Sequence, residues 1–193
     1  MCSINQFKIT TMTKQIIPYQ PIDLQEPKEI VDAVRKRRGG TLLNLDRMLL
    51  NSPNLTRGWN ALLKEVRENL SLDARYKEIG MCGVAILNRA EYEFFHHAPE
   101  LLKAGGTQQQ VDELRKIGTE AFNKSLFSAI EQDVIDLTFA MTREIEVPEA
   151  VMERLTKSLG NQATVEMVAV IATYNMVSRF LIATGIAPES TNH

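Results

Sequence analysis

The segment Arg89–Pro99 concentrates acids, histidines and aromatic side chains, and it contains two of the three histidines of the chain, His96 and His97. Glu93 and His97 are four residues apart, so on a helix they share a face. There the carboxylate can fix the tautomer of the imidazole and raise its basicity. His96 points about 100° away by the helical period. This spacing predicts acid–base chemistry at His97, against the alternative that Glu93 only satisfies a buried histidine.

Other reaction chemistries lack their sequence motifs. The chain has no glycine-rich phosphate-binding or dinucleotide-binding loop, no Gly-x-Ser-x-Gly elbow and no Cys-x-x-Cys pair. Glu-x-x-x-His on one helix face can contribute to a zinc or iron site, but no third nitrogen or sulfur ligand has a supporting position. We therefore expect chemistry that uses neither a cofactor nor a bound metal.

Charge and cysteine usage limit the partners and the compartment. The chain has 22 basic and 24 acidic residues spread along its length, so neither nucleic acid nor an anionic membrane is expected as a partner. Cys2 lies in a polar N-terminal segment, and a bridge from it to Cys82 is not expected. The N-terminus also lacks the apolar stretch of a signal peptide. We therefore expect a cytoplasmic location.

The chain outside this segment has the pattern of a single helical domain. Residues 1–25 contain prolines and little periodicity, which predicts a flexible N-terminal tail and arm. Residues 26–188 form the predicted domain, and 189–193 form a short C-terminal tail. No alternating strand pattern bounded by hairpin turns occurs. Helices are predicted over 26–38, from 44, and over 54–70, 73–88, 90–104, 108–117, 128–144, 149–159 and 164–184.

The helix predicted over 164–184 is the most apolar part of the chain. Glu166 and Arg179 interrupt it, and their cost in a bilayer favours a buried helix over a membrane span. It is apolar around much of its circumference, so it requires burial on several sides. We therefore expect a central or intersubunit helix and a homo-oligomer, from a dimer to a hexamer.

Five blocks of sequence, in this order, resemble the carboxymuconolactone decarboxylase family. The resemblance covers about residues 16–188. It implies an all-α helical bundle of the alkylhydroperoxidase D-like type, built around an antiparallel helix pair and used in symmetric oligomers. The blocks are Gly40-Thr-Leu-Leu-Asn-Leu-Asp-Arg-Met-Leu, Ser52-Pro53, Tyr76-Lys-Glu-Ile, Ala90-Glu-Tyr-Glu-Phe-Phe-His-His-Ala-Pro and Thr173-Tyr-Asn-Met-Val-Ser-Arg-Phe-Leu.

One branch of that family resembles alkylhydroperoxidase D and uses a glutamate, a Cys-x-x-Cys pair and a histidine. On this chain the glutamate corresponds to Glu78 and the histidine to His97, whereas the two cysteine positions are Ala90 and Glu93. A dithiol peroxidase mechanism lacks both sulfurs here. Cys82 lies four residues after Glu78, so a redox role for it is an alternative to its being a core residue.

The decarboxylase branch has a glutamate four residues before the histidine, as in Glu93-Phe-Phe-His-His97, although Phe94 stands where tryptophan is common. This resemblance implies cofactor-free decarboxylation, or related lyase chemistry, on a small unsaturated lactone or keto acid. His97 is the expected general acid or base. Glu93 is expected to orient it, and Glu78 to share or relay the proton.

The substrate of such a reaction is a small organic acid, so a cation should lie near it. Arg179 is the candidate, with Asn175 one turn before it and Tyr174 adjacent. Tyr92, beside Glu93, is a further candidate substrate contact. The alternative for Arg179 is a buried intersubunit ion pair. Two other functions stay open: a peroxidase-related, alkylhydroperoxidase-like antioxidant protein, and a non-catalytic ligand-binding oligomer.

Overall fold

The computed structural model describes residues 14–189, and these form helices, turns and loops without any strand. The predicted all-α fold is therefore confirmed. Cys2 and the other residues of 1–13 and 190–193 lie outside the described part. The α-helices are α1 (Lys28–Arg37), α2 (Asn44–Leu49), α3 (Pro53–Lys64), α4 (Ala74–Leu87), α5 (Glu91–Lys103), α6 (Gln108–Leu114), α7 (Ala129–Arg143) and α8 (Glu149–Thr184), joined by a π-helical segment, η1 (Glu65–Asn69), and a 3-10 turn, η2 (Lys124–Leu126).

Several helices begin where the sequence supplies a capping side chain. Asp73 precedes α4 and accepts a hydrogen bond of 2.8 Å from the amide of Arg75. Thr107 and Ser128 form capping boxes at the starts of α6 and α7. These caps satisfy amide groups that the first turn of a helix leaves without partners. Gly185, in the left-handed conformation, ends α8.

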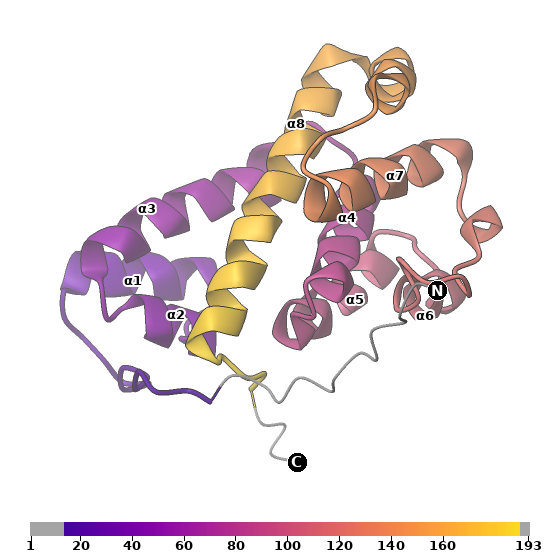
Figure 1. Ribbon diagram of the computed structural model, residues 1–193. Coiled ribbons are helices and arrows are strands. Elements are labelled where there is room, and N and C mark those ends of the chain that lie inside the picture. Colours follow the sequence, from indigo (N-terminus) through magenta and orange to yellow (C-terminus); the bar gives the residue numbers. More distant parts are fainter. Residues whose placement is uncertain (1–13, 190–193) are drawn as a thin grey trace.

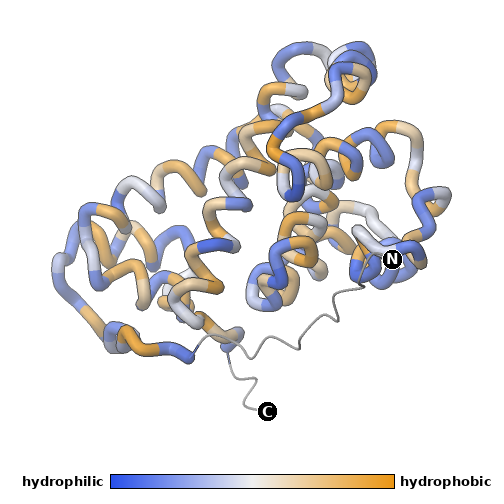
Figure 2. Tube along the Cα trace, viewed as in Figure 1, coloured by the Kyte–Doolittle hydropathy of each residue, from blue (hydrophilic) through white to orange (hydrophobic). Residues whose placement is uncertain are grey.

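Helix α4 is the centre of the bundle, and it packs against α5, α7 and α8. Figure 1 shows α8 running between α1–α3 on one side and α4–α7 on the other. A methyl group at Gly80 of α4 would lie 2.5 Å from the terminal carbon of Met167 of α8, so that flexible side chain would have to move to make room for it. Hydrophobic and hydrophilic residues alternate along the helices in Figure 2, as expected when each helix buries one face.

Helix α3 does not end as a regular α-helix but continues into the π-helical segment η1. Such a segment has i→i+5 hydrogen bonds, which rotate the residues that follow relative to a regular helix. Val66 of η1 is buried, and Arg67 beside it is partly buried. This segment faces α8, which η1 contacts directly.

Helix α8 is bent at Gly160, whose φ of 79° and ψ of 169° are not helical. The break falls between the two helices that the sequence predicts over 149–159 and 164–184. By length and hydropathy α8 would be able to cross a membrane, but half of its most apolar stretch is buried against other helices. That burial is typical of the core helix of a bundle.

The two ends of the described chain lie against the helical domain. In the arm, the amide of Gln20 donates to the carbonyl of Arg47, and Arg47 Nε donates back to the carbonyl of Gln20. At the other end Ile186 is buried. Glu189, which the sequence assigns to the C-terminal tail, accepts a hydrogen bond of 2.8 Å from the amide of Asn44.

Candidate active site

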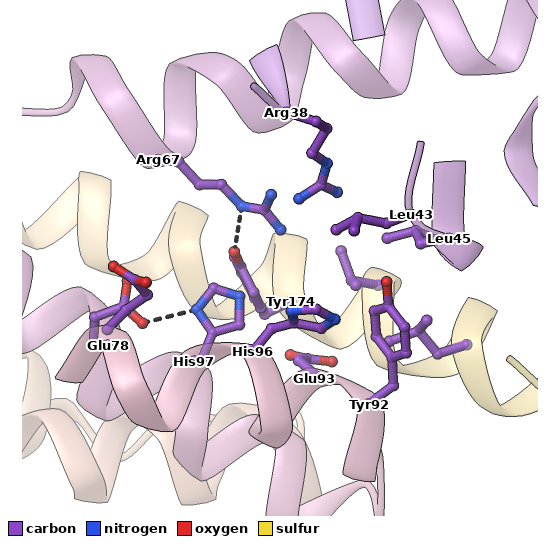
Figure 3. A pocket seen from close by; sticks show the side chains of 13 residues that line it. Arg38, Leu43, Leu45, Arg67, Glu78, Tyr92, Glu93, His96, His97 and Tyr174 are labelled. Atoms are coloured by element: carbon purple, nitrogen blue, oxygen red, sulfur yellow. Dashed lines mark hydrogen bonds and ion pairs between the residues drawn. The ribbon is translucent and has the colours of Figure 1, made fainter. Parts of the chain in front are cut away.

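A cavity of about 340 Å³ lies among α4, α5, α8, η1 and the α1–α2 connection. Charged and aromatic side chains from α4, α5 and η1 line about half of it. Arg38 and Tyr174, together with aliphatic side chains from the α1–α2 connection, α2 and α8, line the rest (Figure 3). This volume is at the small end of the usual range for small-molecule sites. The lining residues are Arg38, Leu43, Leu45, Arg67, Glu78, Tyr92, Glu93, His96, His97, Glu100, Tyr174, Val177 and Leu181.

His97 is hydrogen-bonded across the α4–α5 pair to Glu78. His97 Nδ1 lies 2.7 Å from Glu78 Oε2, and the imidazole packs edge-on against the Tyr174 ring with centroids 4.9 Å apart. Burial lowers the pKa of His97, and the hydrogen bond and charge of Glu78 oppose this. The imidazole is therefore neutral at neutral pH, with Nδ1–H donated to Glu78 and Nε2 left as the acceptor.

Glu93 is not the partner of His97, and that prediction is wrong. Four-residue spacing brings two side chains to one helix face, but their rotamers decide whether they meet. The Glu93 side chain is only 2% exposed, and neither of its carboxyl oxygens has a hydrogen-bond partner among residues 14–189. Burial raises the pKa of Glu93 well above its usual value, and the charge of Arg67 only partly offsets this. Glu93 is therefore held as a neutral carboxylic acid.

Arg67 and Tyr174 form a second pair beside His97, with Arg67 reaching from η1 to the Tyr174 hydroxyl (Figure 3). Arg67 Nε donates a hydrogen bond of 2.8 Å to the Tyr174 hydroxyl oxygen. Burial raises the pKa of Tyr174 to about 12, although Arg67 acts in the opposite direction. The phenol therefore keeps its proton at neutral pH, and because its oxygen accepts from Arg67, its O–H is directed elsewhere.

A second guanidinium group, that of Arg38, lies at the end of the cavity near α1. Arg38 Nε is 3.0 Å from Asp46 Oδ2, and Arg37 is 3.3 Å from the other oxygen of the same carboxylate. Burial lowers the pKa of Arg37 to about 10, with a further contribution from Arg38. Two arginines thus share one buried carboxylate, which leaves this end of the cavity positive.

Tyr92 and His96, at the more exposed end of the cavity, which we call its rim, contact Glu189 of the C-terminal segment. The Tyr92 hydroxyl donates 3.0 Å to Glu189 Oε1, and His96 Nε2 lies 2.9 Å from Glu189 Oε2. Burial would raise the pKa of Glu189, but hydrogen bonds from His96 and the Asn44 amide lower it to about 2. His96 is therefore bonded to Glu189 at the rim of the cavity, whereas His97 is bonded to Glu78 in its interior.

Five of the residues predicted from sequence meet at this cavity, and two do not. Glu78, Glu93, His97, Tyr92 and Tyr174 all line it, whereas Arg179 and Asn175 do not. Arg179 donates a hydrogen bond of 2.6 Å to the Asn175 side chain, whose amide nitrogen donates to Thr142. This pair holds the far side of α8 to α7, so its geometry does not support the predicted substrate contact.

Cys82 is fully buried on α4 and does not line the cavity. Burial, reinforced by Glu78 and Glu93, raises the pKa of its thiol well above the usual value. A thiol in that state is a poor nucleophile. Within residues 14–189, no three acidic, histidine or cysteine side chains converge in a way that could hold a metal ion.

Sequence reasoning missed the two arginines that do face the cavity, Arg38 and Arg67. A signal existed for Arg67, because it lies four residues after Leu63, a buried residue of α3. An arginine on the buried face of an amphipathic helix needs a reason. Arg38 carried no such signal, since it follows the last turn of α1 beside Gly39.

Comparison with known protein families gives a match over part of the chain. Residues 53–129 match the carboxymuconolactone decarboxylase family. They contain the buried Cys82 and all the cavity-lining residues of α4, α5 and η1, among them Arg67, Glu78, Glu93 and His97. No curated protein sequence matches the chain.

Solved structures share the fold across nearly the whole chain. An uncharacterized peroxidase-related protein from Silicibacter sp. TM1040 superposes with a TM-score of 0.75 at 20% identity, covering 95% of this chain and 98% of that one. A peroxidase-related protein with an alkylhydroperoxidase core, from Ralstonia eutropha JMP134, gives a TM-score of 0.72 at 15% identity, covering 89% and 92%.

A third structure, a variant of the debrominase Bmp8 in complex with 2,3,4-tribromopyrrole, gives a TM-score of 0.74 at 15% identity and covers 92% of this chain and 95% of that one. At such identities these likenesses establish the fold and leave the chemistry open. The predicted resemblance is thus confirmed: residues 53–129 match the carboxymuconolactone decarboxylase family, and the chain has the fold of the alkylhydroperoxidase D-like, peroxidase-related proteins.

Proposed function

We propose that this protein is a cofactor-free acid–base enzyme that decarboxylates, or performs related lyase chemistry on, a small unsaturated lactone or keto acid. The observation that carries the proposal is Glu93, a buried carboxyl group without a partner that faces the same cavity as the Glu78–His97 pair. A buried carboxyl group without a hydrogen bond is costly to a fold. Its retention at a cavity wall supports a chemical role.

Glu93 and His97 divide the acid and base roles. Glu93 keeps its proton at neutral pH and is the donor, whereas His97 is neutral and is the acceptor. Enzymes often set the acid and the base of one site by local environments that raise the pKa of one group and lower the pKa of the other. The assignment moves the donor role from His97, where the sequence placed it, to Glu93.

The reaction then balances without a cofactor. The bond between the substrate carboxylate and its carbon breaks, CO₂ leaves, and the electron pair moves into the conjugated carbonyl. The carbon next takes the proton of Glu93. Because Glu93 has no hydrogen bond to His97, a water molecule bound at His97 Nε2 is the proposed source from which the Glu93 carboxylate recovers a proton. Leu43, Leu45, Val177 and Leu181 form an apolar wall that weakens solvation of the departing carboxylate.

The test is a screen of unsaturated lactone acids and keto acids for CO₂ release, followed by kinetics on variants. Glu93→Gln and His97→Ala should each lower turnover roughly 10²- to 10⁴-fold, the usual contribution of an acid–base group. His96→Ala should cost much less, because His96 contacts Glu189 at the rim. If His96→Ala is damaging and His97→Ala is nearly silent, the assignment is wrong.

The shared fold of the peroxidase-related proteins favours a second candidate function, peroxide reduction. Cys82 would then be the reactive group. Consumption of hydrogen peroxide with a dithiol reductant, abolished by Cys82→Ala in a folded protein, would support this function against decarboxylation. We expect Cys82→Ala to leave CO₂ release unchanged, since the thiol does not line the cavity. Binding of organic acids without any turnover would favour a non-catalytic ligand-binding role.

A further inference from the structure

Arg67 is a partly buried cation that has no carboxylate partner among residues 14–189. Its one side-chain hydrogen bond there is from Nε to the Tyr174 hydroxyl. In Figure 3 the remaining guanidinium nitrogens point into the cavity, on the side facing Arg38. A charge kept out of bulk water without a counter-ion is unfavourable, and arginine does not lose its proton to relieve this.

No carboxylate of residues 14–189 forms an ion pair with Arg67. Asp46 and Glu78 favour its charge only through space, because Asp46 is paired with Arg37 and Arg38, and Glu78 is hydrogen-bonded to His97. Glu93, the other acid beside His97, has a pKa raised well above its usual value. The cavity therefore favours an anion beside Arg67.

Tyr174 adds a second donor to the same place. Its oxygen accepts from Arg67, so its O–H is left to donate to a ligand. A guanidinium group and a phenol hydroxyl that line the same cavity and are hydrogen-bonded to each other have the composition of an oxyanion-binding site.

We propose that Arg67 and Tyr174 bind the electron-accepting carbonyl oxygen of the substrate and stabilise the enolate that forms there, while the leaving carboxylate lies against the apolar wall. This inference rests on the proposed function for the identity of the reaction. It follows from where charge moves: during loss of CO₂, negative charge leaves the carboxylate and arrives at the carbonyl oxygen. A cation at the oxygen therefore stabilises the transition state more than the ground state, whereas a cation at the carboxylate would do the opposite.

The substrate class follows from this orientation. It is a small acid whose carboxylate is conjugated, through the carbon that is protonated, to a lactone or ketone carbonyl. The oxygen of that carbonyl must reach Arg67 while the carbon lies at Glu93. A saturated carboxylic acid has no oxygen to receive the charge and should not be a substrate.

The test uses binding of 4-nitrophenol, whose anion mimics an enolate and absorbs differently from the neutral phenol. Titration into the wild-type protein should show the bound probe ionising at a lower pH than the free probe. 4-Nitroanisole, which has the same ring but no ionisable proton, should bind roughly 10- to 100-fold more weakly than the anion, the range for a charged hydrogen bond. This comparison in the wild-type protein does not depend on any variant folding.

Variants then locate the site. Arg67→Gln should remove the preference for the anion, and Arg67→Lys should keep part of it, because the charge stays but the planar fork is lost. Tyr174→Phe should weaken anion binding, and Arg179→Gln, an arginine outside the cavity, should leave it unchanged. Equal binding of phenolate and anisole, no phenolate binding at all, or loss on Arg179→Gln in place of Arg67→Gln would each overturn the inference.

The same measurement separates this inference from the proposed function. Glu93→Gln should retain phenolate binding while losing CO₂ release. If the wild-type protein binds phenolate through Arg67 but decarboxylates no acid in the screen, the oxyanion-binding site stands and the proposed reaction falls. If CO₂ release occurs but phenolate binding ignores Arg67, the reaction stands and this orientation of the substrate falls.

Discussion

At the scale of single residues, the buried carboxyl group of Glu93 lowers the stability of the fold in a way that depends on pH. The folded protein keeps this group protonated, whereas the unfolded chain ionises it above its usual pKa of 4.5. The folded state thus binds more protons than the unfolded state in this range. By linkage, the free energy of unfolding falls as pH rises from about 4.5, by at most about 1.4 kcal/mol per pH unit, until the raised pKa is reached.

Glu93→Gln should therefore stabilise the protein while it lowers turnover. Glutamine keeps the size of the side chain but never ionises, so the stability gain should grow as pH rises from about 4.5 until the raised pKa of Glu93 is reached. Urea unfolding of both proteins across this range measures it. Glu91→Gln, on the same helix but exposed, should not show this pH-dependent gain. Parallel stability curves for the wild type and Glu93→Gln would contradict a raised pKa at this residue.

Glu78 should act on the rate through His97. Its hydrogen bond and charge raise the pKa of His97 against the effect of burial, so Glu78→Gln should lower that pKa further. If neutral His97 is the base, activity rises with pH through the His97 pKa. Loss of the Glu78 charge should therefore move the acidic limb of the pH–rate profile to lower pH. NMR titration of the His97 ring provides the same shift without a substrate. An acidic limb that stays in place or moves upward would refute the pairing.

The sequence predicted which residues line the cavity better than it predicted the hydrogen bonds between them. The resemblance identified Glu78, Glu93 and His97, and the structure brings all three to one cavity. It could not show that His97 bonds to Glu78 on the neighbouring helix, because that depends on how α4 and α5 pack and on side-chain rotamers. The prediction that Arg179 contacts the substrate is not supported for a related reason. Its neighbours in sequence are cavity residues, but its side chain points to the other side of α8.

At the scale of elements, the helices were largely predictable because each leaves a local signal. Apolar residues at helical spacing, capping side chains and glycine breaks indicated all eight, including the interruption of α8 at Gly160. The π-helical segment η1 left none, since one altered turn does not change the composition of a helix. That segment carries Arg67, whose spacing from the buried Leu63 was a signal in the sequence even though the π-helical turn itself was not.

Gly160 gives a test of the α8 bend. Its φ of 79° and ψ of 169° lie in a region that only glycine adopts readily, so Gly160→Ala should cost about 1–3 kcal/mol of stability. Nothing lies within 4 Å of the added methyl group, so the cost would be conformational. Gly58→Ala, also in open space but in the interior of α3, should instead gain about 0.5–1 kcal/mol. Equal effects of the two changes on urea unfolding would contradict the bend.

At the scale of the whole molecule, α8 buries one face and leaves another apolar and exposed. Val165 is 68% exposed and Met176 40%, and Ala169 and Ala172 lie exposed between them at helical spacing. An apolar stripe with small central residues suits packing against a helix of a second copy. The homo-oligomer that the sequence predicts stays a prediction, and this face is its proposed interface.

Light scattering during size exclusion should show at least a dimer at micromolar concentration. Val165→Glu combined with Met176→Glu should shift it toward the monomer, because two charges would be buried in an apolar contact. Ile22→Glu, at another exposed apolar position, should leave the oligomer intact. A monomeric wild-type protein would disprove the prediction.

The central claim is that Glu93 is a protonated, neutral carboxylic acid in the cavity at neutral pH and can donate this proton to the substrate. Infrared spectroscopy measures this without a substrate, because a protonated carboxylic acid and a carboxylate have separate carbonyl bands. At neutral pH the wild-type protein should show the band of a protonated acid, which Glu93→Gln should remove and Glu91→Gln should keep. A wild-type spectrum without that band at neutral pH, or a band that survives in Glu93→Gln, would show that Glu93 is not the acid.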